Sequence, residues 1–370
     1  MKIGILSYPL NNNYGCYLQS YALLHFLRQR GYDAEYIMRR HNKPSWKVYL
    51  KYAIKTIFLN IIHLTWNSPI YNYEWHYMLK KGPRLYPFYE NHIIPHTKPL
   101  YTTKDLEEKC KEYDVIIVGS DQIWRAEILS NVEDYFLGFI RDPKIIKISY
   151  AASFGKEAPG FSQKQLESCG NALSLFKAVS VREEVGLRLI SDYGWKCRNC
   201  MVVLDPTMLL LKEEYMAMAI KGKSPVVFAY ILDETDMKVT AVNRIADELS
   251  LDKVCVLSGV NNKDFVYPSI EKWLSGFVSA SFVVTDSFHG VVFSILFNVP
   301  FAVILNRERG VARFETLLNM FGLGDRVLKD KSDISKILNN KIDWEGVNDI
   351  LNQKREESSY YLLSNIGCGV

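Results

Sequence analysis

The sequence lacks the features that mark several large classes of protein. Its formal net charge is only +4, which is too small to argue for a nucleic-acid partner. It contains neither a GxxxxGK[ST] phosphate loop nor a GxGxxG motif, so P-loop NTPase and dinucleotide chemistry are not supported. These absences direct attention to other kinds of site.

Cysteine and metal-ligand patterns are also sparse. The 7 cysteines are scattered and odd in number, which does not indicate a disulfide framework. Cys197 and Cys200 form one CxxC pair, but a zinc site needs a second ligand pair and none lies nearby. No carboxylate cluster has metal-ligand spacing either, so we expect neither a metal ion nor a bound cofactor.

We also expect neither a signal peptide nor a transmembrane span. "MKIGILSY" begins a strand at once, so we expect a cytoplasmic protein. A strongly apolar stretch opens the segment from Trp46 to about Lys81, and it carries Lys47, Lys51 and Lys55 four residues apart, on one face of a helix. Its aromatic and basic composition is typical of a helix lying on anionic lipid, at the inner face of the cytoplasmic membrane. An insertion packed on its own domain is the alternative.

Alternating strand and helix patterns are what the sequence has instead. "KIGILSY", the helix "CYLQSYALLHFLRQR" and "DAEYIM" form a βαβ unit, which "DVIIVGSD", "IIKISYAASF", "AVSVRE" and "MVVLDPTML" extend. The alternation restarts after Lys223 with "PVVFAYIL", "KVCVLSG", "SFVVTDSFHG" and "PFAVIL". A length of 370 residues also favours two domains.

We therefore predict an α/β protein with two Rossmann-like parallel-sheet domains and an active site in the cleft between them. The first domain is expected over residues 1–212, with an insertion at 43–95, and the second over residues 213–340. Residues 341–370 are expected to form a helical segment that packs back on the first domain.

A polar turn between two apolar stretches is the clearest candidate site. In "TDSFHGVVFSILFNV", a buried strand ends near Thr285, and a helix with apolar residues at helical spacing begins after Ser287. His289 therefore lies at the carboxyl end of a strand and the amino end of a helix, where open α/β sheets bind anions. A surface histidine or a satisfied core histidine is the alternative.

Two turns in the first domain offer further polar groups. The candidates there are Asn13, Tyr14, Gly15 and Gln19 after the first strand, and Ser120, Asp121, Gln122 and Trp124 in "GSDQIW". Gly15 permits close approach of the backbone. An aspartate beside an aromatic ring suits the hydroxyls and the apolar face of a sugar, so Asp121 is the candidate base or acceptor anchor. Capping of the next helix is its alternative role.

Four stretches taken in order, "NNNYGCYLQSYAL", "VGSDQIW", "VSVREE" and "TDSFHG", resemble the polysaccharide pyruvyl transferase family from residue 1 to about 323. The resemblance implies a glycosyltransferase-B-like arrangement of the two domains. It also implies an enzyme that moves pyruvate from phosphoenolpyruvate (PEP) to a sugar as a ketal, with PEP as a substrate and no cofactor. The implied acceptor is a sugar of a bacterial surface-polysaccharide precursor, linked to a polyprenyl lipid.

The resemblance also assigns roles in the donor site. Arg182 in "VSVREE" and His289 are expected to hold PEP, and His289 could also deliver a proton. Ser287 and Gly290 are expected to offer the phosphate a hydroxyl and a backbone N–H. For Arg182, a surface arginine paired with an adjacent glutamate is the alternative.

One basic residue of the family pattern is missing. Where members carry "Met-Arg-Leu-His", this chain has "DSFH", without the arginine. The replacement is expected among Arg307, Arg309 and Arg313, which follow the next strand, and Arg313 is favoured because "ARFETLL" is typical of a helix start beside the cleft. Two other functions remain open: a glycosyltransferase that uses a nucleotide sugar, and a non-catalytic sugar- or PEP-binding module of a glycan-assembly complex.

Overall fold

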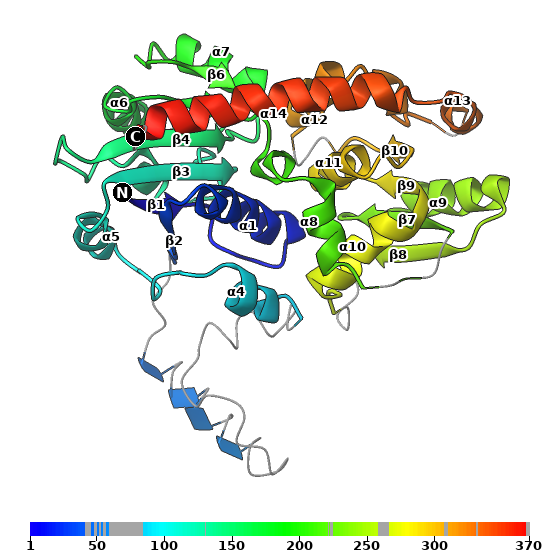
Figure 1. Ribbon diagram of the computed structural model, residues 1–370, viewed down its shortest axis with the longest axis horizontal. Coiled ribbons are helices and arrows are strands. Elements are labelled where there is room, and N and C mark those ends of the chain that lie inside the picture. Colours follow the sequence, from blue (N-terminus) through cyan, green and yellow to red (C-terminus); the bar gives the residue numbers. More distant parts are fainter. Residues whose placement is uncertain are drawn as a thin grey trace.

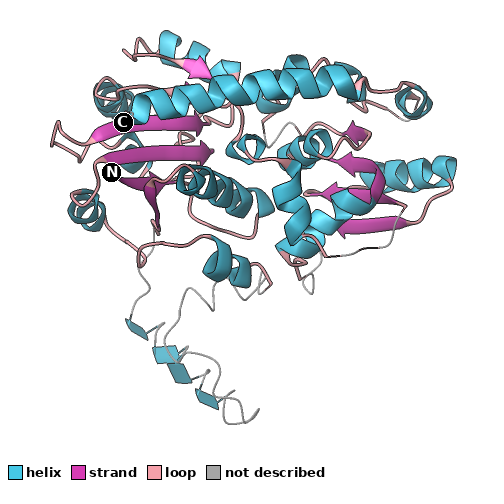
Figure 2. Ribbon diagram, in the orientation of Figure 1, coloured by secondary structure: helices cyan, strands magenta, loops and turns pink. Residues whose placement is uncertain are grey.

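The structure, a computed structural model, describes residues 1–40, 84–129, 131–220, 222, 225–257, 266–306, 310–330 and 332–367, with isolated positions between 46 and 58. Within these residues the chain forms two parallel-sheet α/β domains, which confirms the predicted fold class (Figures 1 and 2). Most of the lysine-bearing segment 46–81 lies outside the described residues, Lys55 included, and its predicted membrane contact stays a prediction. None of the helices described is long and apolar enough to span a bilayer.

The first domain is built on a parallel sheet in the order β2-β1-β3-β4-β5-β6. Its strands are β1 (Lys2–Leu6), β2 (Asp33–Ile37), β3 (Val115–Asp121), β4 (Ile146–Ala152), β5 (Ser180–Val181) and β6 (Met201–Val202). Central strands such as β3, with the sequence VIIVGSD, are buried almost throughout. Continuous apolar runs of this kind are typical of parallel strands covered by helices on both faces.

Helices and short 3-10 turns lie between these strands and continue the chain after β6. They are α1 (Tyr14–Gln29), α4 (Tyr86–His92), α5 (Thr103–Cys110), η1 (Val132–Phe136), α6 (Gln163–Leu173), α7 (Glu184–Asp192), η2 (Pro206–Leu209) and α8 (Lys212–Met218). Asn13 caps α1, since its side chain accepts a hydrogen bond from the N–H of Gly15 at 2.9 Å. This cap fixes the point at which α1 starts, directly after the loop that follows β1.

The second domain has the sheet order β10-β9-β7-β8. Its elements are β7 (Val226–Ile231), α9 (Asp236–Leu249), β8 (Lys253–Leu257), α10 (Ile270–Ser279), β9 (Ala280–Thr285), α11 (Phe288–Leu296), β10 (Phe301–Val303), α12 (Ala312–Met320), η4 (Gly324–Arg326) and α13 (Asp333–Asn339). α11 is apolar around its circumference and buried at every position. It therefore lies inside the molecule, between the two domains.

The two domains share one apolar core. A single cluster of buried side chains runs from β1 and α1 of the first domain to β7, α10 and α11 of the second. At its centre the ring of Tyr14 stacks on Trp273 with centroids 5.0 Å apart, and the Tyr14 hydroxyl donates to the carbonyl of Pro268 at 2.9 Å. Tyr14 thus joins the domains rather than facing a ligand.

The last helix, α14 (Trp344–Ile366), returns from the second domain to the first (Figure 1). The hydroxyl of Tyr361 donates to the carbonyl of Ser149 in β4 at 2.9 Å, and the N–H of Leu204 donates to Ser358 Oγ at 3.0 Å. Arg355 Nε also donates to the carbonyl of Met208 in η2. These bonds hold the C-terminal segment against the first domain.

Candidate active site between the two domains

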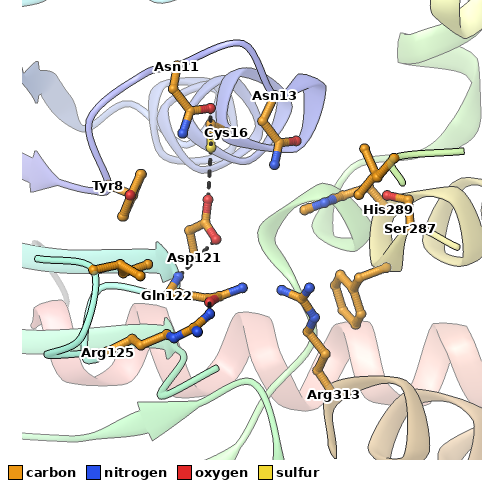
Figure 3. Close-up of a pocket in the computed structure, with 13 residues that line it drawn as sticks. Tyr8, Asn11, Asn13, Cys16, Asp121, Gln122, Arg125, Ser287, His289 and Arg313 are labelled. Carbon is orange, nitrogen blue, oxygen red and sulfur yellow. Dashed lines mark hydrogen bonds between the residues drawn. The ribbon is translucent and has the colours of Figure 1, made fainter. Parts of the chain in front are cut away.

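A cavity of about 180 Å³ lies between the domains, at the carboxyl ends of their central strands (Figure 3). Asp121 ends β3 and Tyr8 follows β1, while Leu232 follows β7 and Ser287 follows β9. Open parallel sheets bind their ligands at this edge. The cavity is lined by Tyr8, Asn11, Asn13, Cys16, Asp121, Gln122, Arg125, Ile128, Leu232, Ser287, Phe288, His289 and Arg313.

The turn between β9 and α11 is held in place by hydrogen bonds and close packing. Thr285 Oγ1 accepts from the N–H of Ser287 at 3.0 Å and donates to the carbonyl of Tyr230 at 2.7 Å. A Cβ at Gly290 would overlap Thr285 Oγ1, so glycine is needed for α11 to start this close to β9. Gly290 does not line the cavity, and the structure gives it a packing role. Ser287 stands at the N-cap position without a capping bond from its side chain.

Asp286, in the same turn, is committed to the second domain. Its carboxylate accepts from the backbone N–H groups of Leu232 and Asp233 at 2.6 and 3.1 Å, and from Lys238 Nζ at 2.6 Å. Its side chain is fully buried. Asp286 therefore fixes the loop after β7, which carries Leu232 to the cavity, and does not itself face a ligand.

His289 projects from the first turn of α11 and is held by groups of the first domain. Its Nε2 lies 2.6 Å from Gln19 Nε2 and 3.6 Å from Asp205 Oδ2. The Nδ1–Cε1 edge of the ring lies over Gly15, where a Cβ would overlap both atoms. The side chain is 8% exposed and contacts Gln19 of the other domain, so His289 is neither a surface histidine nor a residue of one domain alone.

Asp205 and Arg182 form a buried ion pair behind His289. Arg182 Nη1 donates to Asp205 Oδ2 at 3.0 Å, and both side chains are at most 1% exposed. Burial alone would raise the pKa of Asp205, but the charges and hydrogen bonds of His289, Arg182 and Thr207 outweigh it and hold that pKa well below its usual range. The carboxylate is therefore ionised in the folded protein.

Arg182 was expected to contact the donor, and the structure places it one layer behind the cavity. Its guanidinium lies 4.7 Å from the centre of the Phe288 ring, and Phe288 rather than Arg182 lines the cavity. Its Nη2 lies 3.9 Å from Asp121 and its Nε 3.9 Å from Glu183. It is a buried cation surrounded by three carboxylates, not a surface arginine.

Asp121 ends β3 in a strained backbone conformation. Its φ is +75°, in the left-handed region that residues other than glycine rarely adopt. The carboxylate accepts the S–H of Cys16 at 2.9 Å on Oδ2 and the N–H of Gln122 at 2.8 Å on Oδ1. Burial raises the pKa of the Cys16 thiol well above its usual value, and Asp121 raises it further, so the sulfur keeps its proton. Strain of this kind is common where a side chain is aimed into a site.

Six of the predicted site residues line the cavity: Asn13, Asp121, Gln122, Ser287, His289 and Arg313. Gly15 and Gln19 touch His289 from behind, while Tyr14, Ser120, Trp124, Arg182 and Gly290 lie deeper. Trp124 is fully buried against Phe136, and its Nε1 donates to the carbonyl of Tyr135, which places it in the core rather than beside a sugar. Arg307 and Arg309 lie outside the described residues.

The sequence reasoning missed several residues at the site. Arg125 lines the cavity, and its Nη1 donates to Gln122 Oε1 at 2.8 Å, while Glu127 holds its Nε and Nη2. It directly follows "GSDQIW", so its closeness to Asp121 along the chain was the available signal. Tyr8, Asn11, Cys16 and Phe288 lie beside predicted residues in the same turns.

Within the described ranges no group of three or more histidine, cysteine, aspartate or glutamate side chains is placed to hold a metal ion. The CxxC cysteines, Cys197 and Cys200, are joined as a disulfide in the structure and do not line the cavity. The polar groups of the cavity are instead guanidinium, imidazole, amide, hydroxyl and one carboxylate. Such a set can hold an anion and move protons.

We expect Gly15→Ala to disable the site without unfolding the protein. The added methyl group would overlap the His289 ring, and a displacement of about 1 Å at a reacting group can cost about 100-fold in rate. Gly324→Ala is the control, because nothing lies within 4 Å of a Cβ there and its φ is ordinary. Turnover and thermal unfolding of both variants provide the test. A Gly15→Ala enzyme with wild-type turnover would contradict the close packing of Gly15 on His289.

Comparison with solved structures identifies the same architecture in nucleotide-sugar enzymes. UDP-N-acetylglucosamine 2-epimerase from Rickettsia bellii aligns at a TM-score of 0.53 and 9% identity, covering 99% of this chain and 97% of that one. A putative enzyme of the same name from Listeria monocytogenes aligns at 0.51 and 10% identity, covering 95% and 90%. The UDP-GlcNAc-bound 2-epimerase from Neisseria meningitidis aligns at 0.51 and 10%, covering 98% and 100%. At these identities the likeness establishes the fold alone, a glycosyltransferase-B-like pair of domains.

Sequence comparison is more specific. No curated protein matches the chain. The family described as polysaccharide pyruvyl transferase matches residues 13–308, which include α1, every strand from β2 to β10 and the turn that carries His289. This match covers most of the chain and confirms the resemblance seen in its motifs. The chain belongs to the polysaccharide pyruvyl transferase family.

Proposed function

We propose that this protein transfers pyruvate from PEP to a sugar of a surface-polysaccharide precursor, forming a ketal and releasing phosphate. Membership of the pyruvyl transferase family supports a transferase of this kind. The donor, the acceptor and the ketal are our proposals. They are supported by the residues that face each other across the cavity, one set from each domain.

One observation carries the proposal. The amino ends of α1 and α11, from different domains, meet at one cavity that Arg125 and Arg313 also line. Helix amino ends and guanidinium groups both favour anions. PEP carries a phosphate and a carboxylate, so a site with cationic groups on two sides suits it. The cavity of about 180 Å³ is also smaller than the roughly 300–1,000 Å³ of pockets that hold drug-sized ligands, which suits a compact anion.

The second-domain side of the cavity is the proposed donor side. Arg313 takes the place of the arginine missing before His289, and its guanidinium lies 5.7 Å from the Phe288 ring. Ser287 offers a hydroxyl that makes no capping bond to α11. The main proposed role of His289 is to bind the phosphate of PEP, and its second role is to donate a proton to PEP. Arg182 contributes its charge through Asp205 and His289, one layer behind the donor.

The first-domain side is the proposed acceptor side. Asp121 is the proposed base, with Asn13 and Gln122 as hydrogen-bonding partners for sugar hydroxyls. The thiol of Cys16 keeps one carboxylate oxygen of Asp121 in a fixed direction. Two of the residues first expected here, Ser120 and Trp124, are assigned no contact with the sugar because both are buried.

The proposed reaction balances as follows. A proton from the site is added to the methylene carbon of PEP, which places positive charge on C2. One sugar hydroxyl attacks C2 and passes its proton to the base, and phosphate then leaves with the C–O bonding pair. A second hydroxyl of the same sugar attacks C2, loses its proton and closes the ketal. Cations around the phosphate and carboxylate stabilise the charges of these steps.

We expect PEP-dependent phosphate release to continue in the presence of a chelator. The guanidinium and imidazole groups supply the positive charge that a metal ion would otherwise provide. The measurement is phosphate release from PEP with a correct acceptor, with and without EDTA. Loss of release that magnesium or manganese restores would contradict the metal-free proposal.

We also propose that the acceptor is lipid-linked and that the protein works at the inner face of a membrane. This proposal rests on the sequence of the 46–81 segment, with its lysine stripe and aromatic residues. It is independent of the chemistry proposed for the cavity.

A further inference from the structure

Asp205 lies behind the cavity and faces a histidine of the other domain. It follows β6 in the first domain, its side chain is fully buried, and it is absent from the cavity lining. Its polar partners are Arg182, Thr207 and Ser120 from its own domain and His289 from the second. Burying a carboxylate away from water costs free energy unless both of its oxygens have partners.

The two oxygens of Asp205 have separate partners. Oδ1 accepts from the N–H and the hydroxyl of Thr207, at 3.0 and 2.7 Å, and so caps η2. Oδ2 accepts from Arg182 Nη1 at 3.0 Å and from Ser120 Oγ at 3.5 Å, and it lies 3.6 Å from His289 Nε2. The capping role accounts for Oδ1 only. Oδ2 is directed at the ring that projects from α11.

Gln19 completes the surroundings of the ring nitrogen. Its amide nitrogen lies 2.6 Å from His289 Nε2, and within the described part of the chain its buried amide oxygen has no hydrogen-bond partner. A half-turn of the amide exchanges these two atoms. The oxygen then accepts a hydrogen bond from the Nε2–H group, which also lies 3.6 Å from Asp205 Oδ2. Both neighbours of Nε2 are then acceptors, which favours a proton on this nitrogen.

We propose that Asp205 is a positioning residue that keeps a proton on Nε2 of His289 and fixes the imidazole across the domain boundary. Gln19 acts with it from α1. The ring is thereby held with its Nδ1–Cε1 edge over Gly15, at the amino end of α1 and beside the cavity. The expected effect on turnover rests on the proposed function of the protein. The position of the proton on the His289 ring is independent of that function.

The place of the proton is measured on the unmodified protein. In a sample labelled with ¹⁵N-histidine, the His289 signal is identified by its loss in His289→Gln. We expect a protonated Nε2, in the neutral or the charged ring. A neutral ring with its proton on Nδ1 and a bare Nε2 would overturn the proposal. This result requires neither substrate nor a folded Asp205 variant.

Asp205→Asn tests the role of Oδ2 separately. The amide oxygen can still cap η2, while its NH₂ group would face Arg182 and His289 with donors in place of an acceptor. We expect the His289 nitrogen signals to move and kcat to fall by about 100-fold or more, with a much smaller change in the KM for PEP. Unchanged nitrogen signals in a folded variant would overturn the proposal.

Asp134→Asn is the matched control. Asp134 pairs with Arg39 Nη2 at 2.7 Å, both side chains are buried in the first domain, and neither lines the cavity. It reports the general cost of weakening a buried aspartate–arginine pair, and we expect it to leave the His289 signals and kcat unchanged. If Asp205→Asn shifts the His289 signals while no pyruvyl transfer is found in the wild type, the positioning stands and the proposed function fails. If the control shifts those signals equally, the positioning proposal fails.

Discussion

His289→Gln is expected to lose donor affinity and turnover together. Glutamine retains hydrogen bonding but carries no charge and cannot act as an acid. A hydrogen bond from a charged group contributes about 1.5–3 kcal/mol and one from a neutral group about 0.5–1.5 kcal/mol, so this exchange should raise the KM for PEP by about 5- to 13-fold. Loss of acid catalysis lowers kcat by a further factor of about 10²–10⁴.

Steady-state kinetics over a range of PEP concentrations separates the two effects. A raised KM with normal kcat would leave anion binding as the only role of His289. A lowered kcat with a normal KM would leave acid catalysis as the only role of His289. Near-normal values of both constants in a folded enzyme would contradict any role for the turn between β9 and α11 in the reaction.

Arg313→Gln is the second change with a large expected effect. Arg313 is 9% exposed and lines the cavity from α12, so salt and water screen its charge only weakly. Removing one charged donor to a PEP anion should weaken PEP binding by about 10- to 150-fold. Titration calorimetry with PEP measures this directly, without an acceptor.

The matched control for this change is Arg188→Gln. Arg188 is largely exposed on α7, and its nearest carboxylate, Glu157, lies 3.9 Å away. We expect it to bind PEP as the wild type does. If Arg313→Gln also retains full affinity, the replacement cation lies elsewhere, and Arg307 and Arg309 become the next variants.

The fold and one side of the site could be predicted from local patterns. Buried parallel strands are continuous apolar runs, so β3 and β9 stood out in the sequence, and the residues that end them were predicted to face the cleft. His289 and Asp121 were found in this way. Their positions depend only on where a strand ends and a helix begins.

The contacts between distant residues could not be predicted in the same way. The pairing of Gln19, Asp205 and His289 joins three segments and two domains, and no local pattern records it. Trp124 was predicted to contact a sugar but lies in the core, because a local pattern alone has two interpretations here. The sequence of an aromatic residue after an aspartate is the same whether the ring packs on Phe136 or on a sugar. Only the three-dimensional packing distinguishes the two roles.

Mass spectrometry of reaction products tests the central claim most directly. The protein is incubated with a panel of lipid-linked and reporter glycosides, with PEP in one series and nucleotide sugars in another. The proposed function predicts a glycoside heavier by one pyruvyl ketal in the PEP series, with release of phosphate. A glycoside extended by a sugar in the nucleotide-sugar series and unchanged with PEP would contradict it, as would absence of product together with absence of PEP binding by calorimetry.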